Sequence, residues 1–544
     1  MRKAFGLLIL LLAACELRGV ASPRTILVLP FENQSARPDL NWISESFAEM
    51  LSSRLSAADR YVLNRGERNA AYEQLEIPPG TPLTLASIYK VAETLGVDWA
   101  VTGNFAVEGE RLTARAQLLD VHRLQLAPAL EATGELADLL DLQGRLAWRL
   151  LATQEAGFTV GKEEDFARQF PEVRLDAFEN YIRGLLATEA ESRVRFLGEA
   201  NRLDPADHRA ARELGRHYFE QKDYESSARW LRELDQNDPN YLESLFLLGV
   251  DEFFLGRDAA AERAFGQLSH EIPLNEVWNN LGFMQARRGR YQEAVTSFAR
   301  AYQGDSTDPV FCFNLGACLW YLKRYKEAAQ YLEEAARLAG DDPETHTLLA
   351  VVLGSLGNAE GKQREFRWLA EHEGNSLSEI GPDLLPHLRL KKNYDGRAYR
   401  LLSLAVRNAL EKSLEGEPAE RRGEVHVSRG KEFLARGRLS EAEHELVEAV
   451  SLLPGASEAH LALAQVYEAQ GRRQQAAAEL ETSLQLRDTV TAHLHLARVY
   501  LSLDRPEAAR THSRAALSLD PDNHEAQELM EKIPQLAPAA GKKP

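Results

Sequence analysis

The stretch WNNLGFMQARRGRYQEAVTSFARAY, residues 278–302, carries an amphipathic helical pattern on each side of Gly289. In both patterns the apolar residues recur every three or four positions, which is the spacing of one helix face. Gly282 and Ala294 are small, and small residues let the two helices of a hairpin approach closely. The stretch therefore predicts a helix hairpin.

The same pattern returns along most of the chain. Prolines stand at positions 205, 239, 273, 309 and 343, at successive separations of 34, 34, 36 and 34 residues. A second run of the pattern extends from Gly430 to Pro521. A period of this length indicates stacked helix hairpins, because each hairpin buries its apolar face only against its neighbours. We count about nine repeats and predict an all-α solenoid in two blocks, residues 174–375 and 421–522.

The repeated positions resemble the tetratricopeptide repeat consensus. The copy quoted above matches it at Trp278, Gly282, Tyr291, Ala294 and Phe298. The resemblance implies a curved solenoid whose first helices line a concave groove, and a protein or peptide partner that binds in this groove.

The resemblance also places candidate residues on the concave side. In some members of the family, asparagines at the positions of Asn280 and Asn314 hydrogen-bond the backbone of an extended peptide, since a side-chain amide offers a donor and an acceptor. The alternative is that asparagine is a common consensus residue there and that the aromatic side chains form the core between helices. The groove candidates are Phe246, Val250, Phe253, Asn280, Phe283, Phe313, Asn314, Trp320 and Tyr321.

An insert divides the two blocks. Between Ala350 and Gly430 the small-residue pattern is missing over 80 residues, where two periods of 34 would fit. Residues 376–420 hold three prolines and the basic cluster HLRLKK at 387–392, and helical spacing returns over Arg397–Leu414. We predict a non-repeat helical insert, which is also a candidate hinge or contact site.

Three shorter stretches complete the division of the chain. Residues 154–173 are rich in charge and glycine and are predicted to be a linker. Residues 523–532 are predicted to form a polar-faced capping helix, and residues 533–544 a disordered tail.

The residues before the linker predict a small α/β domain over 24–153. The run TILVLPF at 25–31 is apolar without alternation, which is typical of a strand buried on both faces. Helical spacing follows over Ile43–Leu55 and Leu85–Leu95, and alternation over Arg111–Val121 indicates the second strand of a hairpin.

These residues resemble the TolB amino-terminal-like domain of bacterial envelope and signalling proteins. This resemblance implies assembly or regulation rather than catalysis, and it supplies no site residues. The matching stretches are ILVLPFEN (26–33), ISESFAEML (43–51), LGVDWAVTGNF (95–105), RLTARAQLLDV (111–121) and LADLLDLQGRLAWRLL (136–151).

Residues 1–15, MRKAFGLLILLLAAC, have the basic and apolar regions of a secretory signal, and the apolar run is shorter than the roughly 20 residues that span a bilayer. The end of this stretch, LAAC, resembles the bacterial lipobox, which implies a lipid on Cys15, and Glu16 implies the outer membrane. We therefore expect a periplasmic lipoprotein of the cell envelope. The alternative is signal cleavage after Ala21, which would remove Cys15.

Charge and motifs exclude several function classes. The chain has 64 Lys+Arg and 82 Asp+Glu, a net charge of −18, which repels nucleic acid. No phosphate-binding glycine loop, nucleophile elbow, HExxH helix or CxxC pair occurs, so we expect no enzyme, cofactor or metal. His493 and His495 point to different faces of one helix, and Cys312 and Cys318 are too far apart along one helix for a disulfide.

The sequence thus favours a lipid-tethered, non-catalytic scaffold whose repeats bind a protein segment. The second hypothesis is a regulatory sensor, in which the α/β domain binds a small molecule or nucleotide and changes what the repeats hold.

Overall fold

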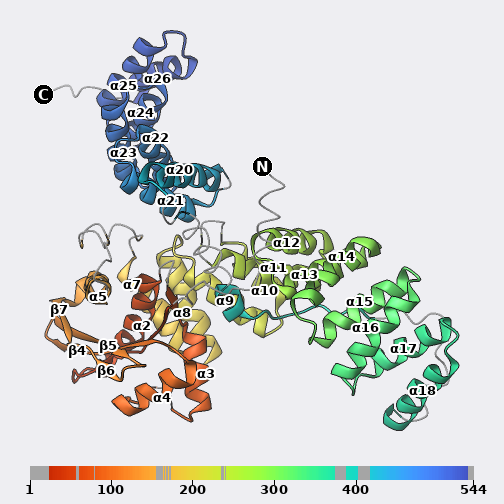
Figure 1. Ribbon diagram of the computed structural model, residues 1–544. Coiled ribbons are helices and arrows are strands. Elements are labelled where there is room, and N and C mark those ends of the chain that lie inside the picture. The colour runs from red at the N-terminus through yellow and green to blue at the C-terminus, as the bar shows by residue number, and fades with distance from the viewer. Residues whose placement is uncertain are drawn as a thin grey trace, which may run out of the picture. The chain divides into compact units, whose positions relative to one another are not determined.

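The computed structural model forms two compact units, residues 1–233 with 242–410 and residues 234–241 with 411–544 (Figure 1). The predicted signal segment with Cys15, most of the linker and the last eight residues lie outside the described part of the chain. The described residues are 24–56, 60–78, 80–154, 163, 166, 170, 173–234, 238, 240–373, 387–401, 414, 417–435 and 437–536.

The first unit begins with a mixed seven-stranded sheet, in which β3, β1, β4, β5 and β6 follow one another. β1 pairs in parallel with β3 and β4, whereas β4 and β5 form the predicted antiparallel hairpin. β2 is added to β4 and β7 to β5. The strands are β1 (Arg24–Val28), β2 (Glu32–Asn33), β3 (Arg60–Val62), β4 (Trp99–Glu108), β5 (Arg111–Asp120), β6 (Gln125–Leu126) and β7 (Leu130–Glu135).

Helices cover both faces of β1, which confirms the predicted doubly buried strand. Ile26 and Val28 pack into the core that contains α2 (Trp42–Leu55) and α5 (Leu139–Gln154). Leu27 and Leu29 pack on the other face against α3 (Arg65–Gln74) and α4 (Leu85–Leu95). The first core continues into the repeats through Phe178 and Tyr181, so the α/β domain and the first hairpin share one core.

β3 and α3 were not predicted. β3 has only three residues and is ordered by its parallel pairing with β1, which sequence spacing does not reveal. α3 does carry a local signal, because Asn64 and Glu67 form a reciprocal capping box at its start.

From Leu175 onward the described chain is helical, apart from turns and residues 387–395. Its described part contains nine antiparallel helix pairs and a last single helix, which confirms the predicted solenoid of repeats. The first block consists of α7 (Leu175–Leu186), α8 (Ala190–Leu203), α9 (Arg209–Glu220), α10 (Tyr224–Leu231), α11 (Tyr241–Phe254), α12 (Asp258–Glu271), α13 (Asn275–Arg287), α14 (Tyr291–Gly304), α15 (Pro309–Tyr321), α16 (Tyr325–Leu338), α17 (Pro343–Ser355) and α18 (Ala359–Glu373).

The second unit holds the remaining helices. They are α20 (Ala419–Ala435), α21 (Leu439–Leu452), α22 (Ser457–Ala469), α23 (Arg473–Leu486), α24 (Val490–Ser502), α25 (Pro506–Leu519) and α26 (His524–Leu536).

The repeat glycines have the predicted packing role. A Cβ atom at Gly316 would lie 2.8 Å from Leu332, and one at Gly430 would lie 2.4 Å from Leu446. Each glycine faces the second helix of its own hairpin, so a larger side chain there would push the two helices apart.

Two predicted stretches differ in the structure. The capping helix α26 runs to Leu536, four residues beyond the predicted end, because Ile533 is fully buried against the second unit's core. In the predicted helical insert, residues 396–401 are helical, within the stretch where helical spacing was expected, whereas residues 387–395 form no helix and their backbone groups bond to side chains of the repeats.

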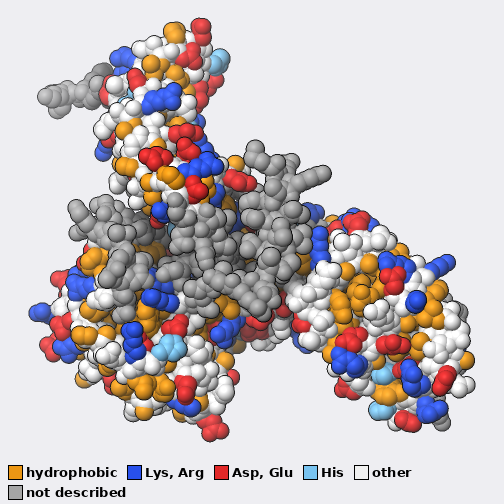
Figure 2. All heavy atoms as spheres, in the orientation of Figure 1, with side chains coloured by type: hydrophobic (Ala, Val, Ile, Leu, Met, Phe, Trp, Pro, Cys, Tyr) orange, Lys and Arg blue, Asp and Glu red, His pale blue; other side chains and the backbone are white. Residues whose placement is uncertain are grey.

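No helix in the described residues is long and apolar enough to cross a membrane. On the face of each unit that Figure 2 shows, basic and acidic side chains are interspersed.

A buried polar pair recurs between the two helices of several hairpins. A histidine on the first helix meets a residue 19 positions later on the second, as in His426 with Glu445 and His460 with Glu479. Between α24 and α25 the acidic partner is replaced, and His493 meets His512 with 2.9 Å between their Nδ1 atoms.

The two kinds of pair shift histidine pKa values in opposite directions. The hydrogen bond to Glu479 raises the pKa of His460, so this pair stabilises the fold at low pH and the contribution is lost as the pH rises through the folded pKa. Burial, and then the neighbouring His493, lower the pKa of His512. The unfolded chain therefore takes up this proton first on acidification, and the fold loses stability below the ordinary pKa of 6.5.

We predict that His512→Glu reduces the acid sensitivity of the second unit, because it restores a histidine–carboxylate pair. All seven tryptophans lie in the first unit, so tryptophan fluorescence follows the unfolding of that unit alone. Circular dichroism follows both units, and an unfolding transition seen only by circular dichroism therefore belongs to the second unit. Thermal unfolding at about pH 7.5 and about pH 5.5 should give a smaller loss of Tm in the variant. The exposed His444→Glu is the control, and an equal loss of Tm in both variants would contradict the assignment.

Candidate peptide-binding groove

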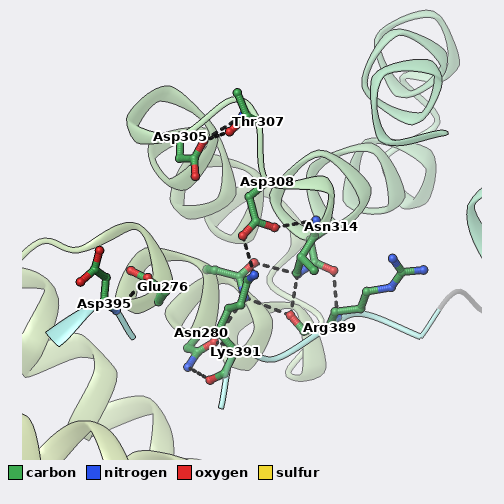
Figure 3. Close-up of polar contacts among 11 residues, drawn as sticks. Glu276, Asn280, Asp305, Thr307, Asp308, Asn314, Arg389, Lys391 and Asp395 are labelled. Atoms are coloured by element: carbon green, nitrogen blue, oxygen red, sulfur yellow. Dashed lines mark hydrogen bonds and ion pairs between the residues drawn. The ribbon is translucent and has the colours of Figure 1, made fainter. Parts of the chain in front are cut away.

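Residues 387–395 lie across the first helices of four successive hairpins without forming a helix or strand. Figure 3 shows the middle of this stretch, with Arg389 beside Asn314 and Lys391 beside Asn280. We call residues 387–395 the groove segment and the surface of α11, α13, α15 and α17 that contacts it the groove. The groove segment runs against the order of the repeats, from His387 at α17 to Tyr394 at α11.

Two asparagines bind the backbone of the groove segment. The Nδ2 of Asn314 donates to the Arg389 carbonyl at 2.7 Å, and the Arg389 N–H donates to its Oδ1 at 2.8 Å. Asn280 makes the same pair of bonds to Lys391, both at 2.8 Å. One step of one repeat thus corresponds to two residues of extended chain.

A third asparagine joins these two into one network. Asn279 donates to the Arg389 carbonyl at 3.0 Å, and its Oδ1 accepts a bond of 2.8 Å from Asn314. All three asparagine side chains lie in residues with 0% exposure. Because buried amide groups are costly without partners, the bonds to the groove segment stabilise the asparagines in the occupied groove.

Two successive repeats make these paired backbone bonds because each has an asparagine at the same repeat position. Asn280 and Asn314 are 34 residues apart, and the equivalent positions one repeat before and after hold Phe246 and Leu348. These apolar side chains cannot bond a peptide backbone.

The guanidinium of Arg389 lies in an acidic and aromatic site. It is 2.6 Å from Asp342 and 3.3 Å from Glu344, and it stacks 3.8 Å from the ring centroid of Phe313. The Arg389 and Asp342 side chains are 24% and 20% exposed, so their interaction is only partly screened by water.

Lys391 occupies a second site of the same kind one repeat earlier. Its Nζ lies 2.5 Å from Asp308 and 5.2 Å from the ring centroid of Phe311. Asp308 directly precedes α15 and Asp342 directly precedes α17, 34 residues later, so the repeat geometry places one carboxylate at each site.

The groove segment ends in an apolar pocket. The Tyr394 ring packs 4.8 Å from Phe246, within a hollow lined also by Leu242, Ile272 and Val277, and burial raises the pKa of its phenol. The chain then turns helical over 396–401 and reaches the α/β domain.

There, Arg400 donates to the Tyr61 hydroxyl at 2.9 Å and lies 2.9 Å from Glu67. Burial and the bond to Glu67 raise the pKa of Tyr61 to about 12, so this phenol stays protonated as a donor.

The structure separates the predicted groove residues into two groups. Asn280, Asn314, Phe246 and Phe313 contact the groove segment. The other candidates contact helices. Val250, Phe253 and Phe283 pack in the array, the last two ring to ring at 5.1 Å, while Trp320 contacts Tyr321, which stacks on Tyr291.

Several groove residues were missed by the sequence analysis. The acidic partners repeat at the proline period and were visible as a pattern, but their role depends on a cationic occupant that the pattern does not show. The missed residues are Glu276, Asn279, Asp308, Phe311, Asp342 and Glu344.

In the described residues no group of three or more histidine, cysteine, aspartate or glutamate side chains is placed to hold a metal ion. The chemistry of the groove is recognition, since its side chains offer backbone hydrogen bonds, carboxylates for cations and aromatic faces.

Comparisons with known proteins identify the repeats. Two tetratricopeptide repeat family models match, one over residues 187–241, 246–309 and 468–524 and the other over 285–352 and 433–489. The chain therefore carries a tetratricopeptide repeat array. No curated protein matches the sequence.

Solved structures of repeat proteins are similar to parts of the array. A tetratricopeptide repeat protein from Parabacteroides merdae is 16% identical, with 54% of this chain and 98% of that chain covered and a TM-score of 0.24. The MamA protein is 16% identical, with coverages of 32% and 98% and a TM-score of 0.29. The first repeat domain of Spaghetti (RPAP3), bound to an HSP90 peptide, is 20% identical, with coverages of 21% and 93% and a TM-score of 0.21.

We predict that Asn280→Ala with Asn314→Ala exposes the groove segment to trypsin after Arg389 and Lys391. The two substitutions remove four hydrogen bonds to the groove segment, so local opening should be favoured by about 2 kcal/mol or more and cleavage should accelerate at least about tenfold. Mass spectrometry of the fragments measures the rate at each bond.

The control is Asn358→Ala, which removes a side chain that directly precedes α18 and accepts a hydrogen bond from the Gly361 N–H in the first turn of that helix. If trypsin cleaves after Arg389 at the same rate in the wild type and in the double variant, the asparagines do not hold the segment.

Proposed function

We propose that this tetratricopeptide repeat array is the binding part of a non-catalytic envelope scaffold that captures an extended segment of a partner protein in its groove. The observation that carries the proposal is the pairing of Asn280 and Asn314 with both backbone groups of one residue each. This mode of binding fits an extended chain of almost any sequence, because it uses groups that every residue except proline has.

The position of the asparagines supports binding as their role. Their amides are fully buried and lie on successive first helices, yet the bonds that satisfy them come from a segment 75 to 111 residues away in the chain. Packing between hairpins alone would be served by apolar side chains at this position and does not require amides that pair with a backbone.

The envelope location rests on the sequence of residues 1–15. We propose that Cys15 is lipidated and tethers the chain to the outer membrane, and that the α/β domain, which resembles the TolB amino-terminal-like domain, lies next in the chain and serves assembly. Its observed mixed sheet with helices on both faces of β1 is compatible with that resemblance.

We predict that a photoreactive benzoylphenylalanine in place of Phe254 crosslinks a partner in the native cell through the groove. Phe254 is 38% exposed on α11, and Lys392 of the groove segment lies 5.1 Å from its ring. Crosslinks to one or a few envelope proteins should disappear when Asn280→Ala and Asn314→Ala are added. With Cys15→Ser, the crosslinked product should leave the membrane fraction.

In the wild-type background the intramolecular crosslink to the groove segment is the control for photochemistry, since it needs no partner. Circular dichroism is the control for folding of the asparagine variant, in which the segment is expected to leave the groove. Partner crosslinks that persist at full yield in the asparagine variant would contradict groove binding. A Cys15→Ser protein that stays in the membrane fraction would contradict the lipid anchor alone.

A further inference from the structure

The groove segment is held by its own chain in the manner expected for a bound peptide. Its contacts extend over four repeats and combine backbone bonds, ion pairs of Arg389 and Lys391, and contacts with aromatic rings. Both the groove and the groove segment belong to the first compact unit. We infer that residues 387–395 are a built-in occupant of the groove, and that the partner competes with them as an extended basic segment whose cationic side chains are two residues apart. This inference rests on the proposed function.

The spacing of the cations follows from the geometry of the occupant. In an extended chain, side chains two residues apart point to the same side, so Arg389 and Lys391 reach carboxylates on successive repeats. Asn314 and Asn280 fix the backbone of these same two residues and thereby set the register. A partner must place its cations in this register to meet both sites.

The chemistry of the two sites selects against other side chains. Asp308 and Asp342 are 19% and 20% exposed, and each is paired with a cation of the groove segment. An acidic or apolar side chain in place of Arg389 or Lys391 would leave a partly desolvated carboxylate without its cationic partner, which is costly. The asparagines supply affinity for any backbone, and these carboxylates supply the preference for basic residues.

An occupant within the same chain has a high effective concentration, on the order of millimolar for a short tether. A free peptide with the same intrinsic affinity for the groove therefore binds the wild-type protein weakly. It binds much more tightly once the groove segment is expelled. Arg389→Glu with Lys391→Glu should expel it, because both new side chains face carboxylates.

The test uses the fluorescent peptide HLRLKKNYD, the sequence of the groove segment, and the full chain. Fluorescence anisotropy should show at least about tenfold tighter binding to the Arg389→Glu/Lys391→Glu variant than to the wild type. Arg397→Glu, an exposed position on the same stretch, is the matched control and should bind like the wild type. Circular dichroism and tryptophan fluorescence establish that each variant is folded.

A second peptide tests the selectivity for paired cations. RKHLLNKYD has the same composition, but no two of its lysines and arginines are two residues apart, and it should bind the opened variant at least about tenfold more weakly. Adding Asn280→Ala and Asn314→Ala to the opened variant should abolish binding of HLRLKKNYD.

Each failure has its own meaning. Equal affinity of HLRLKKNYD for wild type and opened variant would overturn the built-in occupant and leave groove binding intact. Equal affinity of the two peptides for the opened variant would overturn the paired-cation rule. Absence of binding to the folded, opened variant would contradict the proposed function itself. A wild-type dimer that becomes monomeric in the opened variant, by light scattering, would show that the segment fills the groove of a second copy.

Discussion

Two side-chain amides, those of Asn280 and Asn314, each close both backbone hydrogen bonds of one residue in an extended chain. Both amides are buried with the segment in place, and a buried amide without partners costs about 1–3 kcal/mol, so an occupant that pairs with both is favoured over one that leaves them unpaired. The acidic residues before α15 and α17 add charge to the same requirement. The backbone of Arg389 and Lys391 and the cations of their side chains are thus each paired with a group on the repeats.

This constraint also links the groove to the rest of the first unit. The stretch 387–401 begins in the groove and ends at Arg400, which bonds Tyr61 and Glu67 of the α/β domain. The α/β domain in turn shares its core with α7. Groove, segment and α/β domain therefore form one connected structure, in which a single stretch of fifteen residues contacts both the repeats and the α/β domain.

The repeats were predictable from sequence because their determinants are local and periodic. Gly316 and Gly430 mark where two helices of one hairpin meet, and the run at 25–31 marks a strand buried on both faces. The groove segment was not predictable, because its extended form depends on side chains 75 to 111 residues away. The same holds for β3, whose three residues are ordered by pairing with β1. Asn280 and Asn314 were found through the repeat consensus, whereas their occupant was seen only as a basic cluster in an insert.

Amide hydrogen exchange at single-residue resolution shows whether Asn280 and Asn314 hold the groove segment in the groove. The N–H groups of Arg389 and Lys391 donate to Asn314 and Asn280, although neither residue belongs to a helix or strand. The account predicts that these two amides exchange about a hundredfold more slowly than in an unstructured peptide, and that Asn280→Ala with Asn314→Ala removes the protection. Exchange of both wild-type amides at the rate of an unstructured peptide would contradict it.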